Sequence, residues 1–600
     1  MPEKRTPTPE QQKVIDLTDR TVLLSAAAGS GKTATLTERL IQMITRENDP
    51  LDVTRMLVVT FTRAAAEELR VRISEALANA VAERPDDRRL AKQMLLLPTA
   101  RIRTIDAFCN DLVKGHTEEL GISPLYRIAD EAECDLFGIS LLDEVIEDAY
   151  NGIYAPEGLD VATLIEIAET VKGSGTLAPM LYELYKNRLH GEKNGVSRLA
   201  DSAAQLIKEA SLPFFATRAG QALAAHYKET ARHARALLSA SGDTVLSLFG
   251  KDNPIFQTLH PRFFYLLSMA ERIAEACDES LDALRAIEDE YALPSVPNCP
   301  PRYEYAKEET LFKKLIGETD STLKEIFSAL SWTQEELSQA HLAVSRVSTS
   351  LYLLFKEFED RFREEKKRRA ICDYSDIAAY AYELLVNEDG TPTPLALEMR
   401  GAFDAVCIDE YQDVNETQHR IFEAISTERN RFMVGDIKQS IYAFRGAVPD
   451  IFGRLRQSFP SPEANEDRAV LYLTRNFRSE ENIISFANGV FDFLFPIIGD
   501  AIGYVPEDRL YTEKEKGALP VPTFYLMEKE SKKKSALDEE ADALRLKTED
   551  ELIAEKVSYL LANGKKKDGS PIRPKDIAIL TREYPYELIE TLKADRKSVV

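Results

Sequence analysis

The chain has 600 residues, with 76 Lys and Arg against 100 Asp and Glu and a formal net charge of −24. This acidity argues against attachment to nucleic acid through bulk positive charge, although it leaves room for a local basic groove. The content of 44% apolar and 29% charged residues is typical of a soluble globular protein. The length predicts about three to five domains.

The six cysteines are scattered, with no Cys-x-x-Cys pair and no His partner at ligand spacing. This pattern gives no support to a zinc site, an iron–sulfur cluster or a disulfide framework, and it favours a reducing compartment. The N-terminus lacks an apolar leader, and the apolar stretches fall short of the roughly 20 residues that a bilayer crossing needs. The sequence therefore predicts a cytoplasmic protein.

The first part of the chain alternates apolar strands with helical segments, which is the pattern of a parallel sheet with crossover helices. We expect strands there at 21–25, 56–61 and 100–105. From 116 to 365 the apolar residues recur at helical spacing with almost no strand-like alternation, which predicts a large α-helical insertion. Within it, Thr333 and Glu336 form a capping-box pattern that predicts a helix start directly after Trp332.

Strand-like segments return after the insertion, at 402–410, 431–436, 469–474 and 520–527. A lysine-rich stretch at 528–550 is typical of an exposed linker. Near the end, residues 574–584 predict one more strand and residues 586–594 a helix. The alternation of strands and helices predicts an α/β fold with parallel sheets.

The strongest local signal is a run of small residues between an apolar strand and a helical segment, which is the setting of a phosphate loop. Backbone N–H groups close around phosphate oxygens there and the helix N-terminus adds a favourable dipole, so bulky side chains are excluded. The loop residues are Ala26, Ala27, Ala28, Gly29, Ser30, Gly31, Lys32 and Thr33. Lys32 would reach the β and γ phosphates, and Thr33 would hold Mg²⁺. Ala26 stands where the pattern GxxxxGK[ST] has Gly, and a chance Gly-rich helix start is the alternative.

A nucleotide site also needs carboxylates at the end of a neighbouring strand. Asp409 would bind Mg²⁺, and Glu410 would take the proton from the attacking water. A lone Asp-Glu pair is usually a solvated strand end. The apolar strand before this pair, together with a phosphate loop elsewhere in the chain, favours the catalytic interpretation.

Several segments resemble the motifs of the UvrD-like superfamily-one DNA helicases, in the same order and spacing. They are Thr8–Gln11, Thr60–Ala65, Thr104–Phe108, Asp409–Asn415, Val434–Gly446 and Asn476–Ser479. Lys438 and Phe444 resemble the AddA/RecB branch of helicase-nucleases more than the UvrD/PcrA branch. Ala34 departs from the UvrD-type Arg that covers adenine, and Asp106 departs from a frequent His.

The resemblance implies RecA-like, P-loop-bearing domains interrupted by the helical insertion. Residues 1–115 and 366–465 would form the ATP-binding domain 1A, residues 116–365 the helical domain 1B, and residues 466–600 the start of a second RecA-like domain, 2A. It further implies ATP and Mg²⁺ as cofactors, 3′ to 5′ translocation on single-stranded and duplex-end DNA, and an AddB-like partner in double-strand break repair and recombination.

No candidate for motifs V and VI, a 2B domain or the exonuclease signature of such proteins follows residue 490. We therefore expect the front part of a longer helicase-nuclease, which binds ATP but unwinds DNA poorly alone. Two alternatives stay open. One is a UvrD/PcrA-type repair helicase without a nuclease, and the other is a non-catalytic module that binds DNA or a partner.

The resemblance also implies roles for single residues. Gln11 would read adenine, with a helix-capping role as the alternative. Gln439 would sense the γ-phosphate, and Arg478 would act as an arginine finger, with a surface turn as its alternative. DNA contacts would come from stacking aromatics and from groups that hold the backbone phosphates. These candidates are Phe61, Tyr442 and Phe444 for stacking, with core packing as the alternative, and Thr60, Thr104 and Arg445 for the phosphates.

Overall fold

The structure is a computed structural model. It describes residues 6–172, 177–190, 195–249, 254–296, 306–442, 446–498, 504–514, 522–523, 525, 548–566, 569–582 and 584–596. The chain divides into two compact units, residues 1–515 and 516–600. Each unit is described by itself.

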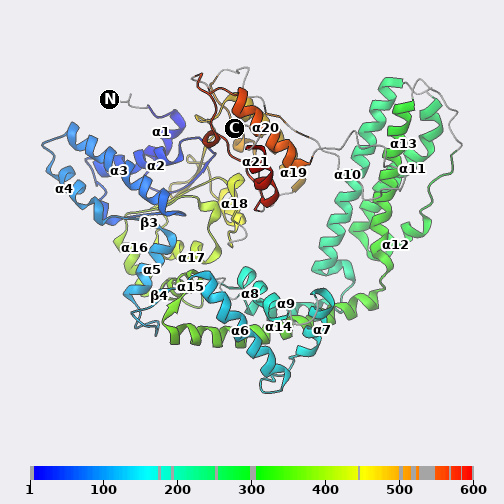
Figure 1. The fold of residues 1–600 in the computed structure, drawn as a ribbon, viewed down its shortest axis with the longest axis horizontal. Helices are drawn as coiled ribbons and strands as arrows, with labels where there is room; N and C mark the ends of the chain where they lie inside the picture. The colour runs from blue at the N-terminus through cyan, green and yellow to red at the C-terminus, as the bar shows by residue number, and fades with distance from the viewer. Residues whose placement is uncertain are drawn as a thin grey trace. The chain divides into compact units, whose positions relative to one another are not determined.

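A six-stranded parallel sheet lies at the centre of the first unit (Figure 1). Its strands, in the order in which they lie side by side, are β3 (Arg101–Thr104), β2 (Met56–Thr60), β6 (Ala405–Ile408), β7 (Arg431–Gly435), β1 (Thr21–Ala26) and β8 (Arg468–Leu473). The four central strands are buried along their whole length. Such burial is expected when helices cover both faces of a parallel sheet. The predicted α/β class is confirmed.

Two apolar cores lie on opposite faces of this sheet, because alternate strand residues such as Leu23 and Leu24 point to opposite sides. One core includes residues from α1 (Pro9–Asp16), α2 (Lys32–Thr45), α3 (Arg63–Glu83) and α4 (Arg88–Leu96). The other includes residues from α5 (Ile105–Gly115), α15 (Tyr374–Leu385), α16 (Pro394–Ala402), α17 (Glu416–Ile425) and α18 (Pro449–Ser458). Segments from both sides of the helical insertion therefore build one layered domain.

Strand β8 is the edge strand beside β1, with Thr21 opposite Arg468 and Ala26 opposite Leu473. The expectation that residue 466 opens the second RecA-like domain is therefore wrong for β8. The alternating burial of β8 fits a strand with one face on the core, which a local pattern cannot assign to one sheet or another. The helix α19 (Glu481–Ile498) follows it. The remaining division into domains 1A, 1B and 2A stays a proposal.

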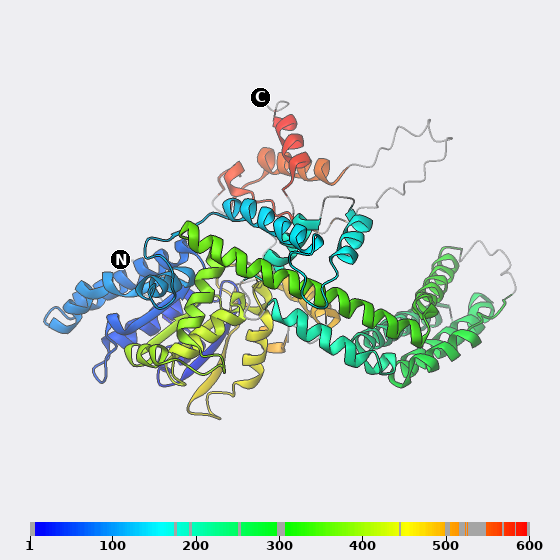
Figure 2. The same ribbon diagram turned by 90° about the horizontal axis from the view of Figure 1, so that it is seen from below.

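The insertion is helical, as predicted, apart from the short pairing of β4 (Arg127–Ile128) with β5 (Ile371–Cys372). Its helices are α6 (Glu131–Tyr150), α7 (Val161–Lys172), α8 (Leu177–Arg188), α9 (Ser197–Glu209), α10 (Arg218–Phe249), α11 (Pro254–Glu279), α12 (Leu281–Glu290), α13 (Ala306–Ser328) and α14 (Gln334–Arg369). One core joins α10 to α13, and a second joins α6, α7 and α8 to α14. Figure 2 shows α14 running from the helices α10 to α13 towards the sheet. The capping box of Thr333 and Glu336 at the start of α14 is confirmed.

A buried ionic cluster lies where α14 ends and α15 begins. Lys366 Nζ lies 3.0 Å from Asp373 Oδ2 and 2.6 Å from Asp376 Oδ1, and His190 Nε2 lies 2.9 Å from Asp373 Oδ2. Asp373 and Asp376 also form the capping box that starts α15. Burial raises the pKa of Asp373, but His190 and Lys366 outweigh it and hold that pKa below its ordinary value. The cluster thus ties the insertion to the sheet domain.

Replacing Asp373 by Asn is expected to lower the free energy of unfolding by about 3 kcal/mol at pH 7, because Lys366 stays buried with one counter-charge fewer. The pKa of Asp373 lies lower in the folded than in the unfolded chain. Its contribution is therefore present above about pH 4 and is lost as the pH falls further. Denaturant unfolding at pH 7 and pH 3 measures this difference, with Asp289→Asn on the surface as the control. A cost equal at both pH values would contradict the assignment.

The second unit contains α20 (Glu549–Asn563) and α21 (Tyr586–Arg596), which pack against each other. The helix predicted at 586–594 is confirmed. The strand predicted at 574–584 is wrong, because a short 3-10 turn at Pro574–Asp576 leads into irregular backbone. A strand needs a neighbour to pair with, and no strand runs beside this segment among the described residues of the unit.

The strand expected at 520–527 lies outside the described residues, except for positions 522, 523 and 525. The linker expected at 528–550 lies outside them up to residue 547. In the described part of the chain, every helix is too short or too polar to cross a lipid bilayer.

Candidate functional site

The loop between β1 and α2 has the backbone shape of a phosphate loop. Gly29 and Gly31 have φ of +72° and +87°, in the left-handed region that favours glycine. Gly31 caps α2, so the first N–H groups of that helix face the loop. The hydroxyl of Ser30 is buried and has no hydrogen-bond partner among the described residues. An incoming phosphate would satisfy all of these groups.

The two predicted carboxylates follow β6, and Lys32 reaches them. Lys32 Nζ lies 3.1 Å from Glu410 Oε2. Burial and the neighbouring Glu410 raise the pKa of Asp409 to about 6, against the opposing effect of Lys32. Glu410 has φ of +52°, which is uncommon for a residue with a side chain and is typical of functional sites. Two crowded carboxylates near one ammonium group suit a bound divalent cation.

Gln412 connects Glu410 to the predicted γ-phosphate sensor, a role that the sequence did not suggest. Its Nε2 donates to Glu410 Oε2 at 3.0 Å, and its Oε1 accepts from the backbone N–H of Asp436 at 2.9 Å. Gln439 Nε2 in turn donates to Asp436 Oδ2 at 2.7 Å. Burial and the charge of Glu410 raise the pKa of Asp413, beside Gln412, to about 6. The carboxyl ends of β6 and β7 thereby form one hydrogen-bonded group.

The turn that carries Arg478 sits directly on the phosphate loop. Asn476 Nδ2 donates to the carbonyl of Ala28 at 2.7 Å, and the N–H of Phe477 donates to the carbonyl of Gly29 at 2.9 Å. Arg478 is exposed, and its Cβ would lie 2.8 Å from a Cβ added to Gly29. The structure therefore brings Arg478 next to the loop, as its predicted role requires.

Replacing Gly29 by Ala is expected to lower kcat for ATP hydrolysis by about tenfold or more, since small displacements of catalytic groups are costly. The new methyl group would force the turn of Asn476 and Arg478 away from the loop, and the φ of +72° would be strained. Steady-state ATPase assays measure the effect. Gly390→Ala, at another left-handed glycine with open space around its Cβ position, is the matched control. Equal rates for both variants would contradict this packing.

Gln11 links the first helix to the phosphate loop. It forms the predicted capping box with Thr8, and its Nε2 donates to the carbonyl of Ser30 at 2.9 Å. The capping interpretation is therefore confirmed, while the reading of adenine stays a prediction. Ala34 lies in the first turn of α2.

The expected DNA-contacting residues divide into two groups. Phe61 follows β2 and stacks on Tyr442, with ring centroids 5.0 Å apart and planes at 26°. Thr60 is buried and donates to the carbonyl of Thr62, whereas Thr104 caps α5, the helix whose first turn includes Asp106. These two threonines have local structural roles at the ends of paired strands. Phe444 and Arg445 lie outside the described residues.

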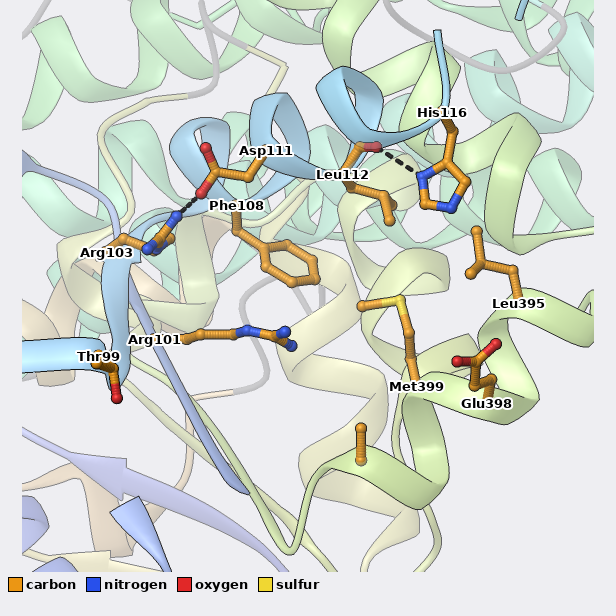
Figure 3. A pocket seen from close by; sticks show the side chains of 11 residues that line it. Thr99, Arg101, Arg103, Phe108, Asp111, Leu112, His116, Leu395, Glu398 and Met399 are labelled. Atoms are coloured by element: carbon orange, nitrogen blue, oxygen red, sulfur yellow. Dashed lines mark hydrogen bonds and ion pairs between the residues drawn. The ribbon is translucent and has the colours of Figure 1, made fainter. Parts of the chain in front are cut away.

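A cavity of about 440 Å³ lies at the β3 edge of the sheet (Figure 3). Phe108, Leu112 and Met399 form its apolar part, and Arg103 pairs with Asp111 at its rim. None of the residues predicted for the nucleotide site lines it. The chemistry predicted from the motifs is therefore located elsewhere, at the carboxyl ends of β1, β6 and β7.

Residues 7–460 match the sequence model of a family described as "UvrD/REP helicase N-terminal domain". Among curated proteins, the chain is similar to the AddA chain of the "ATP-dependent helicase/nuclease" of three bacteria. With Lachnoclostridium phytofermentans it is 32% identical over 526 residues, which are 84% of this chain and 36% of the relative. With Clostridioides difficile it is 30% identical over 529 residues, covering 85% and 40%. With Geobacillus kaustophilus it is 30% identical over 625 aligned positions, covering 98% and 48%. The chain thus spans a third to a half of these relatives' length.

Proposed function

This chain belongs to the UvrD/REP helicase family, and from that premise we propose that it is the ATP-hydrolysing motor part of an AddA-type DNA helicase-nuclease. The observation that carries the proposal is the 3.1 Å contact of Lys32 with Glu410 beneath a loop shaped for phosphate. A cation on the loop and a base on the neighbouring strand are the two groups that phosphoryl transfer to water requires.

In this proposal each residue has one task at the reacting phosphate. Lys32 and the loop N–H groups of Ala27–Gly31 bind the phosphate oxygens. Glu410 accepts the proton of the attacking water, and Gln439 senses the γ-phosphate. Arg478 stabilises the charge of the transferring phosphoryl group.

The residue set also fits a divalent metal ion. The carboxylate of Asp409 is buried with a raised pKa, which indicates a place where positive charge is favourable. Thr33, in the first turn of α2, and Asp409 would hold Mg²⁺, which would neutralise charge on the phosphate oxygens. Gln11 would read the adenine.

Coupling to DNA would use the segment after β7. Gln439 and Tyr442 are three residues apart, so a movement of the γ-phosphate sensor reaches the aromatic that stacks on Phe61. Phe61, Tyr442 and Phe444 would stack on bases, and Arg445 would contact backbone phosphates. Thr60 and Thr104 would act from the strand ends below them.

The wider assignment rests on the resemblance to AddA and on the relatives named as helicase/nuclease. It comprises 3′ to 5′ translocation, work on single-stranded and duplex-end DNA in double-strand break repair, and an AddB-like partner. Domain 1A would contain the sheet, domain 1B the helices α6 to α14, and domain 2A would begin after β8. Such a function places the chain with the chromosome, in the cytoplasm.

Nucleotide-dependent DNA binding tests the proposal. A fluorescent oligo(dT) is expected to bind with clearly different Kd values in the presence of ADP and of a non-hydrolysable ATP analogue, because the two nucleotides set Gln439 differently. A duplex of the same length without single-stranded ends is the comparison. Equal affinities in the two nucleotide states would show a DNA-binding module without a motor.

A further inference from the structure

One carboxylate outside every motif lies fully buried against the nucleotide site. Asp508 lies in the segment 504–511, about thirty residues beyond the turn of Arg478, and its side chain is 1% exposed. Both of its oxygens accept from Arg456 NH1 of α18, each at 2.7 Å. Its Oδ1 also accepts from Ser25 Oγ at 3.4 Å, at the end of the strand that leads into the phosphate loop.

The same carboxylate shares a buried lysine with the γ-phosphate sensor group. Lys438 Nζ lies 2.8 Å from Asp436 Oδ1 and 3.8 Å from Asp508 Oδ1. The side chains of Lys438 and Asp436 are 5% and 3% exposed. Arg456, Lys438, Asp436 and Asp508 thus form a buried set of two cations and two carboxylates. In such a set the removal of one member leaves an uncompensated buried charge.

The segment of Asp508 also supports the turn of Arg478 through its backbone. The carbonyl of Tyr511 accepts from the N–H of Asn476 at 2.7 Å, and the N–H of Tyr511 donates to the carbonyl of Thr474 at 3.1 Å. Asn476 in turn is bonded to the phosphate loop at Ala28. The segment 504–511 therefore contacts both groups that are proposed to act on the γ-phosphate.

We infer that Asp508 is a positioning residue for ATP hydrolysis, which sets Gln439 by drawing part of the charge of Lys438 away from Asp436. While Lys438 is shared, Asp436 keeps its 2.7 Å hydrogen bond from Gln439. Without Asp508, Lys438 pairs with Asp436 alone and competes with Gln439 for it. This inference rests on the proposed function, since it assigns a residue to the same hydrolysis site.

Asp508→Asn is expected to lower kcat by about tenfold, with KM for ATP and the stoichiometry of fluorescent ATP-analogue binding close to wild type. Glu507→Gln, the exposed neighbour, is the matched control and is expected to behave as wild type. A fall in kcat that matches a loss of nucleotide-binding sites would reflect unfolding alone and overturn the inference. So would an unchanged kcat.

The double variant Lys438→Met with Asp508→Asn separates positioning from simple support of Arg456. It restores the charge balance, and it frees Asp436 to hold Gln439, so its kcat is expected to return to within about threefold of wild type. A partner role towards Arg456 alone predicts no recovery, which would overturn the inference. The double variant also carries the test if Asp508→Asn does not fold.

Wild type and Lys32→Ala are measured in the same assay. Absence of Lys32-dependent hydrolysis in the wild type would overturn the proposed function together with this inference. Lys32-dependent hydrolysis that is indifferent to Asp508→Asn would overturn the inference alone.

Discussion

Glu410→Gln is expected to lower the rate of ATP hydrolysis by about 100-fold or more while nucleotide still binds. The change keeps the size and the hydrogen-bonding atoms of the side chain but removes the base that takes the proton from water, and general-base catalysis is worth about 10² to 10⁴ in rate. The amide also loses the charge that pairs with Lys32 at 3.1 Å. ATPase assays and binding of a fluorescent ATP analogue measure the two properties separately.

The exposed Glu466, in the loop before β8, provides the control for this change. Glu466→Gln removes the same charge and is expected to leave kcat unaltered. If Glu410→Gln kept more than about a tenth of the wild-type rate, another group would have to act as the base.

Lys32→Ala is expected to lower hydrolysis by about 100- to 1000-fold and also to weaken ATP binding by about tenfold or more, because a charge-assisted contact to the phosphates is lost. In the free protein the same change removes the cation that opposes the rise of the pKa of Asp409. We therefore expect a further rise of that pKa in the variant, which NMR titration of the carboxyl groups measures.

The matched control is Lys92→Ala, on the exposed side of α4. It removes one positive charge from the same domain without touching the site. Binding of ATP by Lys32→Ala with wild-type affinity would show that the loop holds nucleotide in another way.

Much of the site could be predicted because its parts are local. The run from Ala26 to Thr33 and the pair Asp409–Glu410 each depend on a strand, a turn and the residue types within it. The sheet then brings the two together, since the carboxyl ends of parallel strands lie at one edge. The capping boxes of Gln11 and Glu336 were predictable for the same reason.

The contacts that the sequence did not reveal are distant in the chain and have no motif. Asp508 lies in the segment Pro506–Asp508, which reads as an ordinary turn, and its partners Arg456 and Lys438 lie 52 and 70 positions away. Likewise, β8 has the pattern of a strand, but only packing decides that it pairs with β1. The segment around Leu580 has strand-like composition without a neighbour to pair with, so propensity alone misled there.

The most direct test of the proposed motor is the steady-state rate of ATP hydrolysis by the 600-residue chain, with and without single-stranded oligo(dT). The proposal predicts a rate that rises by about tenfold or more with DNA, because stacked bases at Phe61 and Tyr442 set Gln439 for hydrolysis. It predicts that Glu410→Gln abolishes this rise. A rate that is the same with and without DNA, or that is unaffected by Glu410→Gln, would contradict it.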